Sequence, residues 1–373
     1  MQRAHLRCPL LIASLVIAGA QGGMFFGSEA IAQPAAARLV PTFEVAAGWP
    51  KVPAKWKLGD QSSFAVDAED NVWLLHRPRT LPPADAAMAA PPVMVFDSAG
   101  NFLKAWGGPG SGYEWPGREH GIHIDYKAYV WIGGNSCPTR GQPGVTDDQL
   151  LKFTQDGKFV MQIGHSNQSK GNADTQNLHR PADAWVHPQS NEVFVADGYG
   201  NHRIIVFDAD TGVFKRMWGA FGNAPVDDDD HCEVETSISF AAGNGPPSFN
   251  IPHAIRVADD DGMVYVADRE NRRVQMFLPD GTFVKQIVRT DIPFAKDLAL
   301  SADRAQRFLY VGGGKGIMVI DRKTLDLVGT IDPPGMIGTG HHIATDSKGN
   351  IYIAQPSRGM QKLIFKGMSA ASR

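Results

Sequence analysis

The chain has 373 residues, 43% of them hydrophobic, and a formal net charge of -3. This composition supports a large buried core and is not that of a disordered chain. The small charge, with no long basic run, excludes the electrostatic footprint of a nucleic-acid-binding protein.

The N-terminal segment has the pattern of a signal peptide. Arg3 and Arg7 precede the apolar run 8–20, and small residues at 30–32 provide a cleavage site. The apolar run is too short to span a bilayer comfortably. We therefore predict that residues 1–32 direct export to the periplasm or outside the cell, and that residues 33–373 form one domain with no membrane contact after cleavage. An uncleaved anchor is the alternative.

Cysteine usage leaves one pairing open. Cys8 lies in the predicted signal peptide, so Cys137 and Cys232 are the two that remain. An oxidising compartment allows them to pair, but both lie in long predicted loops, and two free thiols are an equal alternative.

Two copies of one pattern indicate a repeat. VFVADGYGNHRIIVF begins at Val193 and VYVADRENRRVQMF begins at Val264. A shorter alternating run and a polar turn precede each copy, and a turn and a further strand follow it. Alternation with frequent turns predicts four antiparallel strands per unit.

The same pattern extends along the chain. Repeated four-stranded sheets without helices pack radially, so we predict an all-β fold, a six-bladed β-propeller. The last unit lacks one strand, which we expect the segment Thr42 to Ala47 to supply, closing the ring. Pro/Gly-rich stretches at 79–92, 107–118 and 220–247 become surface loops. The predicted units are roughly 61–107, 118–164, 178–219, 248–287, 292–331 and 338–367.

Histidines recur at one position of alternate units. The residues that begin the first strands, nearest the channel mouth, are Ser62, His120, Ala182, His253, Lys296 and His341. In a closed ring, the three imidazoles point at the axis with threefold disposition. Three protein ligands and an open fourth position are typical of catalytic zinc, with iron and manganese as alternatives. One such histidine alone would be interpreted as a polar residue beside the channel.

The second strands bring further side chains to the same rim, because an antiparallel strand ends beside the start of its partner. Arg77, Tyr199 and Arg269 stand at or just beyond those ends. Arginine binds carboxylates, and a tyrosine near a metal cation can act as a base. Alternatively, Arg269 pairs with Asp268 or Glu270, and Tyr199 packs on a neighbouring loop.

VADGYGNHR, VADRENRR, HGIHID and the histidine-led last unit resemble the catalytic domain of peptidyl-α-hydroxyglycine α-amidating lyase, and the repeats resemble the NHL type. The similarity runs from Leu58-Gly59 through the last unit. The resemblance implies zinc on His120, His253 and His341, with Arg77, Tyr199 and Arg269 lining the active site. It implies a lyase that cleaves a peptide's C-terminal α-hydroxyglycine to a peptide amide and glyoxylate. Tyr199 would take the hydroxyl proton, and Arg77 or Arg269 would hold the carboxylate.

The resemblance also implies a calcium ion in the channel, bound by the backbone carbonyls of Phe64 and Ile122 and by a carboxylate. His342 stands at the carboxylate's position. Neutral imidazole is a poor calcium ligand, so the sequence argues against this second metal. The role of His342 itself stays open. Two other family positions differ: Thr339 replaces a methionine and Gly200 replaces a cysteine.

The sequence therefore predicts a metal-dependent lyase whose partner is a small-molecule or peptide C-terminal substrate. One alternative is a propeller hydrolase of the lactonase type, whose metal ligands lean on carboxylates and amides. Another is a non-catalytic NHL-type binding module, which would hold no tight metal.

Overall fold

The computed structural model describes residues 39–227, 232 and 247–370. The predicted signal peptide, residues 1–32, lies outside them. Within the described residues, no helix is both long enough and apolar enough to cross a membrane.

Six four-stranded antiparallel sheets make up the fold, which confirms the predicted six-bladed β-propeller. The first five blades each use four strands consecutive in the sequence. Blade 1 comprises β2 (Asp60–Val66), β3 (Val72–Arg77), β4 (Val93–Phe96) and β5 (Phe102–Trp106); blade 2 comprises β6 (Glu119–Ile124), β7 (Tyr129–Gly134), β8 (Leu150–Thr154) and β9 (Phe159–Ile163); blade 3 comprises β10 (Asp183–His187), β11 (Glu192–Asp197), β12 (Arg203–Asp208) and β13 (Phe214–Trp218). Blade 4 comprises β14 (Pro252–Val257), β15 (Val264–Asp268), β16 (Arg273–Phe277) and β17 (Phe283–Val288); blade 5 comprises β18 (Asp297–Leu300), β19 (Phe308–Gly312), β20 (Ile317–Asp321) and β21 (Leu327–Ile331).

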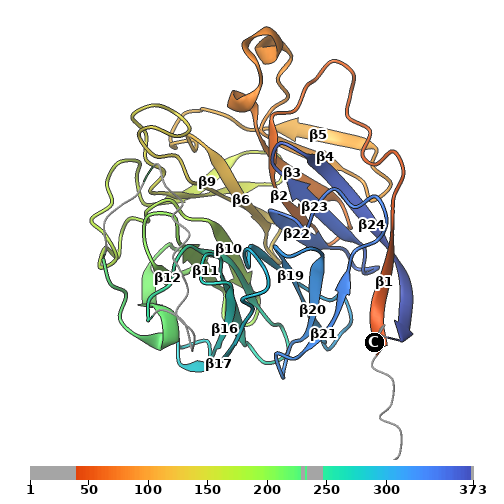
Figure 1. Cartoon of the computed structure of the whole chain (residues 1–373). Coiled ribbons are helices and arrows are strands. Elements are labelled where there is room, and N and C mark those ends of the chain that lie inside the picture. The colour runs from red at the N-terminus through yellow and green to blue at the C-terminus, as the bar shows by residue number, and fades with distance from the viewer. Residues whose placement is uncertain (1–38, 228–231, 233–246, 371–373) are drawn as a thin grey trace, which may run out of the picture. The chain divides into compact units, whose positions relative to one another are not determined.

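The last blade joins the two ends of the described chain. Its strands are β22 (His342–Thr345), β23 (Ile351–Gln355), β24 (Gly359–Ala370) and β1 (Leu39–Val45). The N-terminal strand β1 pairs antiparallel with β24 on the outside of the blade, as Figure 1 shows in orange beside blue. The predicted closing segment Thr42 to Ala47 overlaps this strand.

The hydrophobic core is divided among the spaces between blades. Each of six buried clusters draws its side chains from two successive blades, including one between blade 6 and blade 1 that contains Phe64 and Tyr352. A single blade would leave both faces exposed to water, so the blades stabilise one another only in a closed ring.

The inner strands β2, β6, β10, β14, β18 and β22 surround the channel. Their first residues define one rim, called here the histidine rim, and their last residues approach the opposite rim. A cavity of about 680 Å³ lies toward the opposite rim, where residues 64–66, 122–124 and 343–345 are among those that line it.

Cys137 and Cys232 form a disulfide bond, which settles the pairing that the sequence left open. Cys137 follows β7 of blade 2, and Cys232 belongs to the segment between blades 3 and 4. The bond connects positions 95 residues apart in the sequence. It therefore fastens one long loop of the histidine rim to another.

Candidate metal centre

His120, His253 and His341 converge at the histidine rim. They come from blades 2, 4 and 6, near the first residues of β6, β14 and β22. Their ring centroids lie 4.9 Å, 4.8 Å and 5.0 Å apart, an almost equilateral triangle. The structure thus brings together the three side chains that the sequence pattern singled out as metal ligands.

Each of these histidines is oriented by the next blade. Its Nδ1 faces a backbone carbonyl oxygen of the residue at the corresponding position there. The pairs are His120 with Ala182 at 2.7 Å, His253 with Lys296 at 2.7 Å and His341 with Ser62 at 2.9 Å. A carbonyl can only accept, so Nδ1 carries the proton and the Nε2 lone pair is left for a ligand. The six strand-start positions therefore alternate between supplying an imidazole and supplying the oxygen that orients it.

The environment favours the neutral form of these imidazoles. Burial lowers the pKa of His120, His253 and His341 well below the usual value, and neighbouring imidazoles lower it further. Neutral imidazole is the form that binds metal ions. The three rings are therefore suited to hold a cation near pH 7.

A fourth histidine joins the group, and sequence reasoning left its role open. The ligand atoms of His120, His253, His341 and His342 all lie within 4.8 Å of one another, so this cluster could hold a metal ion. Among the described residues, no other group of three or more His, Cys, Asp or Glu side chains has its ligand atoms close enough together to hold a metal ion. The sequence signal for His342 was its place directly after His341.

Tyr199 reaches the same cluster from the turn that follows β11. Its hydroxyl oxygen lies 2.9 Å from Nε2 of His120 and 3.0 Å from Nε2 of His253. Arg269, which follows β15, donates from Nη1 to that oxygen across 3.3 Å. Arg269 also pairs with Glu270, as one sequence alternative predicted. The phenol oxygen therefore lies at the histidine cluster, in contact with two imidazoles and one guanidinium.

The repeated motif explains how these two turns are held. Asp197, the last residue of β11, accepts a hydrogen bond from Arg203 at the start of β12, at 2.9 Å. Asp268 and Arg273 repeat this pair in blade 4 at 2.6 Å. All four side chains are buried, so each pair fixes the turn between its strands. Those turns carry Tyr199 and Arg269.

Arg77, the last residue of β3, forms hydrogen bonds to residues that flank the histidines on two neighbouring blades. Its Nε donates to the carbonyl of Glu119 at 2.7 Å, and its Nη2 donates to Oγ of Ser62 at 3.0 Å. Ser62 Oγ in turn donates to the carbonyl of His120 at 2.8 Å. Burial lowers the pKa of Arg77 to about 9, so its guanidinium stays charged at neutral pH. Arg77 is thus a buried cation that braces the strand of His120.

Sequence reasoning missed two further cations near the cluster. Arg118 lies close enough to lower the pKa of Arg77, and Lys296 lies close enough to lower that of His253. Both side chains are partly exposed. With Arg269, they give the mouth of the site a positive character that favours an anionic ligand.

The proposed calcium position has a different chemistry. Phe64 and Ile122 line the cavity on the channel side, as does Arg256. The guanidinium of Arg256 pairs with Asp183 at 2.5 Å and with Asp297 at 3.5 Å. Calcium requires several oxygen ligands, but these carboxylates already face an organic cation. The side chains at this level do not fit a calcium ion.

The fold and the histidine cluster describe the class: the chain is a six-bladed β-propeller that contains a match to the NHL repeat and resembles the amidating lyases. The NHL repeat family matches residues 249–277, which include β14, β15 and β16. The matched segment contains His253 and Arg269.

Known proteins extend this likeness beyond one repeat. The chain is 27% identical over 286 residues, 72% of its length, to peptidyl-glycine alpha-amidating monooxygenase A of Xenopus laevis. It is 30% identical over 159 residues, 42% of its length, to a probable peptidyl-alpha-hydroxyglycine alpha-amidating lyase of Caenorhabditis elegans. It is 27% identical over 239 residues, 62% of its length, to NHL repeat-containing protein 3 of Homo sapiens. The matches span 26% of the Xenopus protein, 36% of the worm protein and 56% of the human protein.

Proposed function

We propose that the protein is a metal-dependent carbon–nitrogen lyase of the amidating type. It cleaves an α-hydroxyglycine, or a related carbinolamide, to an amide and glyoxylate. The observation that carries the proposal is the Tyr199 hydroxyl, 2.9 Å and 3.0 Å from Nε2 of two histidines in the cluster. Histidines with a purely structural role would not require a tyrosine hydroxyl placed between their Nε2 atoms. The relatives include an alpha-amidating monooxygenase and a probable alpha-amidating lyase, and these names support the same reaction class.

His120, His253 and His341 hold the metal, which we propose to be zinc. When bound, the metal supplies a Lewis acid that stabilises negative charge on the substrate's hydroxyl oxygen. The donor set fits this role, because three oriented Nε2 atoms converge and Tyr199 stands beside two of them.

Tyr199 is the proposed general base. It accepts the proton of the carbinol hydroxyl, and the carbon–nitrogen bond breaks with its electron pair moving to nitrogen. Protonation of that nitrogen gives the amide, and the carbinol carbon becomes the aldehyde of glyoxylate. Arg269 donates to the phenol oxygen and so orients it for this transfer.

Cations at the rim would bind the substrate's carboxylate. Arg269 lies beside Tyr199 and suits this role, because guanidinium forks onto carboxylates. Arg77 is 2% exposed, and two of its nitrogens already donate to Ser62 and Glu119. We therefore assign Arg77 mainly to positioning His120, and Arg269 to the substrate. A peptide C-terminus and a small α-hydroxy acid derivative both present such a carboxylate.

Export is part of the proposal. The disulfide between Cys137 and Cys232 supports an oxidising compartment, either the periplasm or the outside of the cell. The predicted signal peptide, residues 1–32, agrees with such a location.

The test is to measure metal by mass spectrometry and glyoxylate release from α-hydroxyhippurate with the purified protein. We expect one metal ion per chain, and we expect His120→Ala, His253→Ala and His341→Ala each to lose most of the metal and the activity. Metal-loaded protein that releases no glyoxylate would contradict the substrate class, and lactone turnover would favour the hydrolase. Unchanged metal content in all three variants would favour the binding module.

A further inference from the structure

His342 has the position of a ligand without being part of the threefold pattern. It is the first residue of β22 and is 1% exposed. Its Nε2 is buried and has no hydrogen-bond partner among the described residues. An unpartnered buried nitrogen costs free energy, commonly about 1–3 kcal/mol, unless a ligand satisfies it. The side chain of His342 belongs to the same cluster as the three rim histidines.

The four imidazoles are arranged almost as a tetrahedron. The ring centroid of His342 lies 5.2 Å from His120, 5.3 Å from His253 and 4.9 Å from His341. These values are close to the 4.8 Å to 5.0 Å that separate the other three rings. Such equal spacing places one point at a similar distance from all four rings. We propose that His342 is a fourth nitrogen ligand of the metal, a proposal that rests on the metal-dependent function above.

The side of approach follows from the strand. His342, the first residue of β22, directly follows His341, and residues 343–345 line the cavity toward the opposite rim. His342 therefore enters from the channel, whereas Tyr199 comes from a turn at the histidine rim. With four imidazoles bound, a substrate oxygen would be a fifth ligand, and it would enter from the Tyr199 side.

A carboxylate lies near Nδ1 of His342, on the side where backbone carbonyls orient the other three histidines. Nδ1 of His342 lies 3.7 Å from Oδ2 of Asp297 on the adjacent blade. Asp297 is itself fixed, because it accepts the backbone N–H of Ile343 and pairs with Arg256. A carboxylate on the Nδ1 side favours the tautomer that leaves the Nε2 lone pair for a metal, and a hydrogen bond from Nδ1 to Asp297 in the metal-bound protein would strengthen the basicity of Nε2. Asp297 is thus a positioning residue for His342.

The proposal has a consequence for metal choice. Four imidazole nitrogens suit zinc, cobalt, nickel and copper and are poor ligands for calcium or magnesium. Asp183 and Asp297 lie on either side of Arg256 near the site, and burial raises the pKa of both carboxyl groups. His342, which stands at the position of the family's calcium-binding carboxylate, would instead bind the metal of the histidine cluster.

The experiment is X-ray absorption spectroscopy of the zinc-loaded protein, which counts imidazole ligands, together with chelator competition for affinity. We expect four imidazoles in the wild type and three in His342→Ala, with affinity weakened at least 10-fold. Asp297→Asn should keep four imidazoles and weaken zinc binding by about 10- to 100-fold. Asp183→Asn is the matched control, because Asp183 pairs with Arg256 but not with His342, and it should keep both the ligand count and the affinity near wild type.

A count of three imidazoles in the wild type overturns the assignment of His342 and leaves the lyase proposal standing. Because this count needs no variant, it decides the question even if His342→Ala fails to fold. Wild-type protein that takes up no zinc overturns both proposals. A four-imidazole site that releases no glyoxylate supports the His342 assignment and contradicts only the reaction.

Discussion

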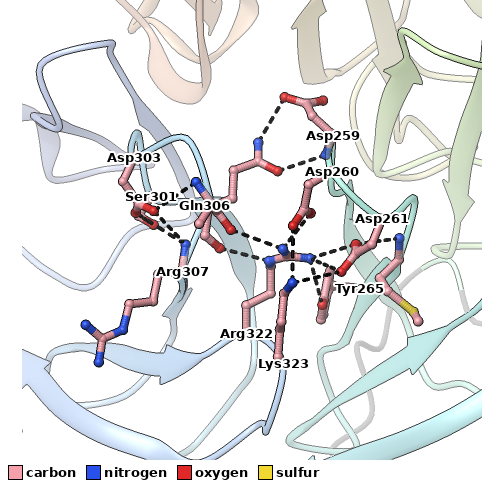
Figure 2. A network of polar contacts seen from close by, with 12 residues as sticks. Asp259, Asp260, Asp261, Tyr265, Ser301, Asp303, Gln306, Arg307, Arg322 and Lys323 are labelled. Atoms are coloured by element: carbon pink, nitrogen blue, oxygen red, sulfur yellow. Dashed lines mark hydrogen bonds and ion pairs between the residues drawn. The ribbon is translucent and has the colours of Figure 1, made fainter.

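Each rim of the propeller buries a polar cluster, and the two clusters differ in how far their members satisfy one another. At the opposite rim, Arg322 follows β20 and is fully buried. Figure 2 shows its guanidinium between Asp260 and Asp261, on the turn between β14 and β15. The distances are 2.6 Å to Asp260 and 2.8 Å to Asp261, and further donors reach the carbonyls of Ala305 and Gln306 at 3.1 Å and 2.8 Å. All three guanidinium nitrogens thus have acceptors.

At the histidine rim, the polar atoms of the cluster satisfy one another only in part: Tyr199 contacts Nε2 of His120 and His253, whereas Nε2 of His342 has no hydrogen-bond partner among the described residues. The cluster consists of four imidazoles and includes no carboxylate of its own. Tyr199 can donate its one proton to only one of the two Nε2 atoms that it contacts. Buried polar groups that are fully paired serve the structure, whereas buried groups that converge unpaired indicate a ligand. The Arg322 network therefore holds blades 4 and 5 together, and the histidine cluster is the place to look for chemistry.

The largest expected effect is on activity, and it comes from comparing a tyrosine substitution at the histidine rim with one at the opposite rim. Tyr199→Phe removes the proposed base, so we expect kcat for glyoxylate release to fall by about 10²- to 10⁴-fold. Metal content should stay at the wild-type level, because the histidines remain. Tyr265→Phe is the control, since the Tyr265 hydroxyl meets Arg322 at 3.4 Å in the opposite network. Activity retained in Tyr199→Phe would exclude the phenol as the base.

Much of this arrangement could be predicted from the sequence, because it follows from strand periodicity. The two copies around Val193 and Val264 define the blade, and a closed ring of blades puts strand starts at one rim. Antiparallel pairing then brings Tyr199 and Arg269 to the histidines. The catalytic and ligand roles of these residues stay predictions.

The rest depends on contacts between blades, which no single strand pattern records. Neighbouring residues of a strand point to opposite faces, so periodicity placed His341 at the axis and gave no reason to place His342 there. The pairs of Arg256 with Asp183 and Asp297 each join different blades. The disulfide joins two loops that have no period at all.

The next prediction concerns stability at the opposite rim. Arg322→Met leaves Asp260 and Asp261 with only the exposed Lys323 as a cation, and it leaves two carbonyls without donors. We expect the free energy of unfolding to fall by about 2–3 kcal/mol; breaking a fully buried pair costs more, but these side chains are 32% and 28% exposed. Urea unfolding of the metal-free protein measures this change.

Zinc content and glyoxylate release should be unaffected in folded Arg322→Met protein. Arg322→Lys keeps the charge but not the planar fork, so its loss should be intermediate. If Arg322→Met lost metal while keeping its stability, the two rims would not be separate in function.

The smallest expected effect concerns His123, a histidine beside the channel whose Nε2 already has a hydrogen-bond partner. Nε2 of His123 accepts the backbone N–H of Val186 at 3.1 Å, and its ring lies 4.6 Å from that of Trp185. Burial, with a smaller effect of Arg256, lowers the pKa of His123 from 6.5 to about 3. The folded protein therefore excludes a proton that the unfolded chain binds below pH 6.5. The stabilisation is complete above pH 6.5 and is lost as the pH falls toward 3, about 2 kcal/mol of it by pH 5.

His123→Gln replaces the titrating nitrogen with an amide oxygen that can accept the same N–H. We expect the variant to lose about 2 kcal/mol less than the wild type between pH 8 and pH 5, measured by urea unfolding of metal-free protein. Because both proteins contain the same four-histidine cluster, the difference between them isolates His123. Equal losses in the two proteins would mean that the His123 imidazole does not contribute to the pH dependence of stability, and that protons taken up on unfolding bind to other groups.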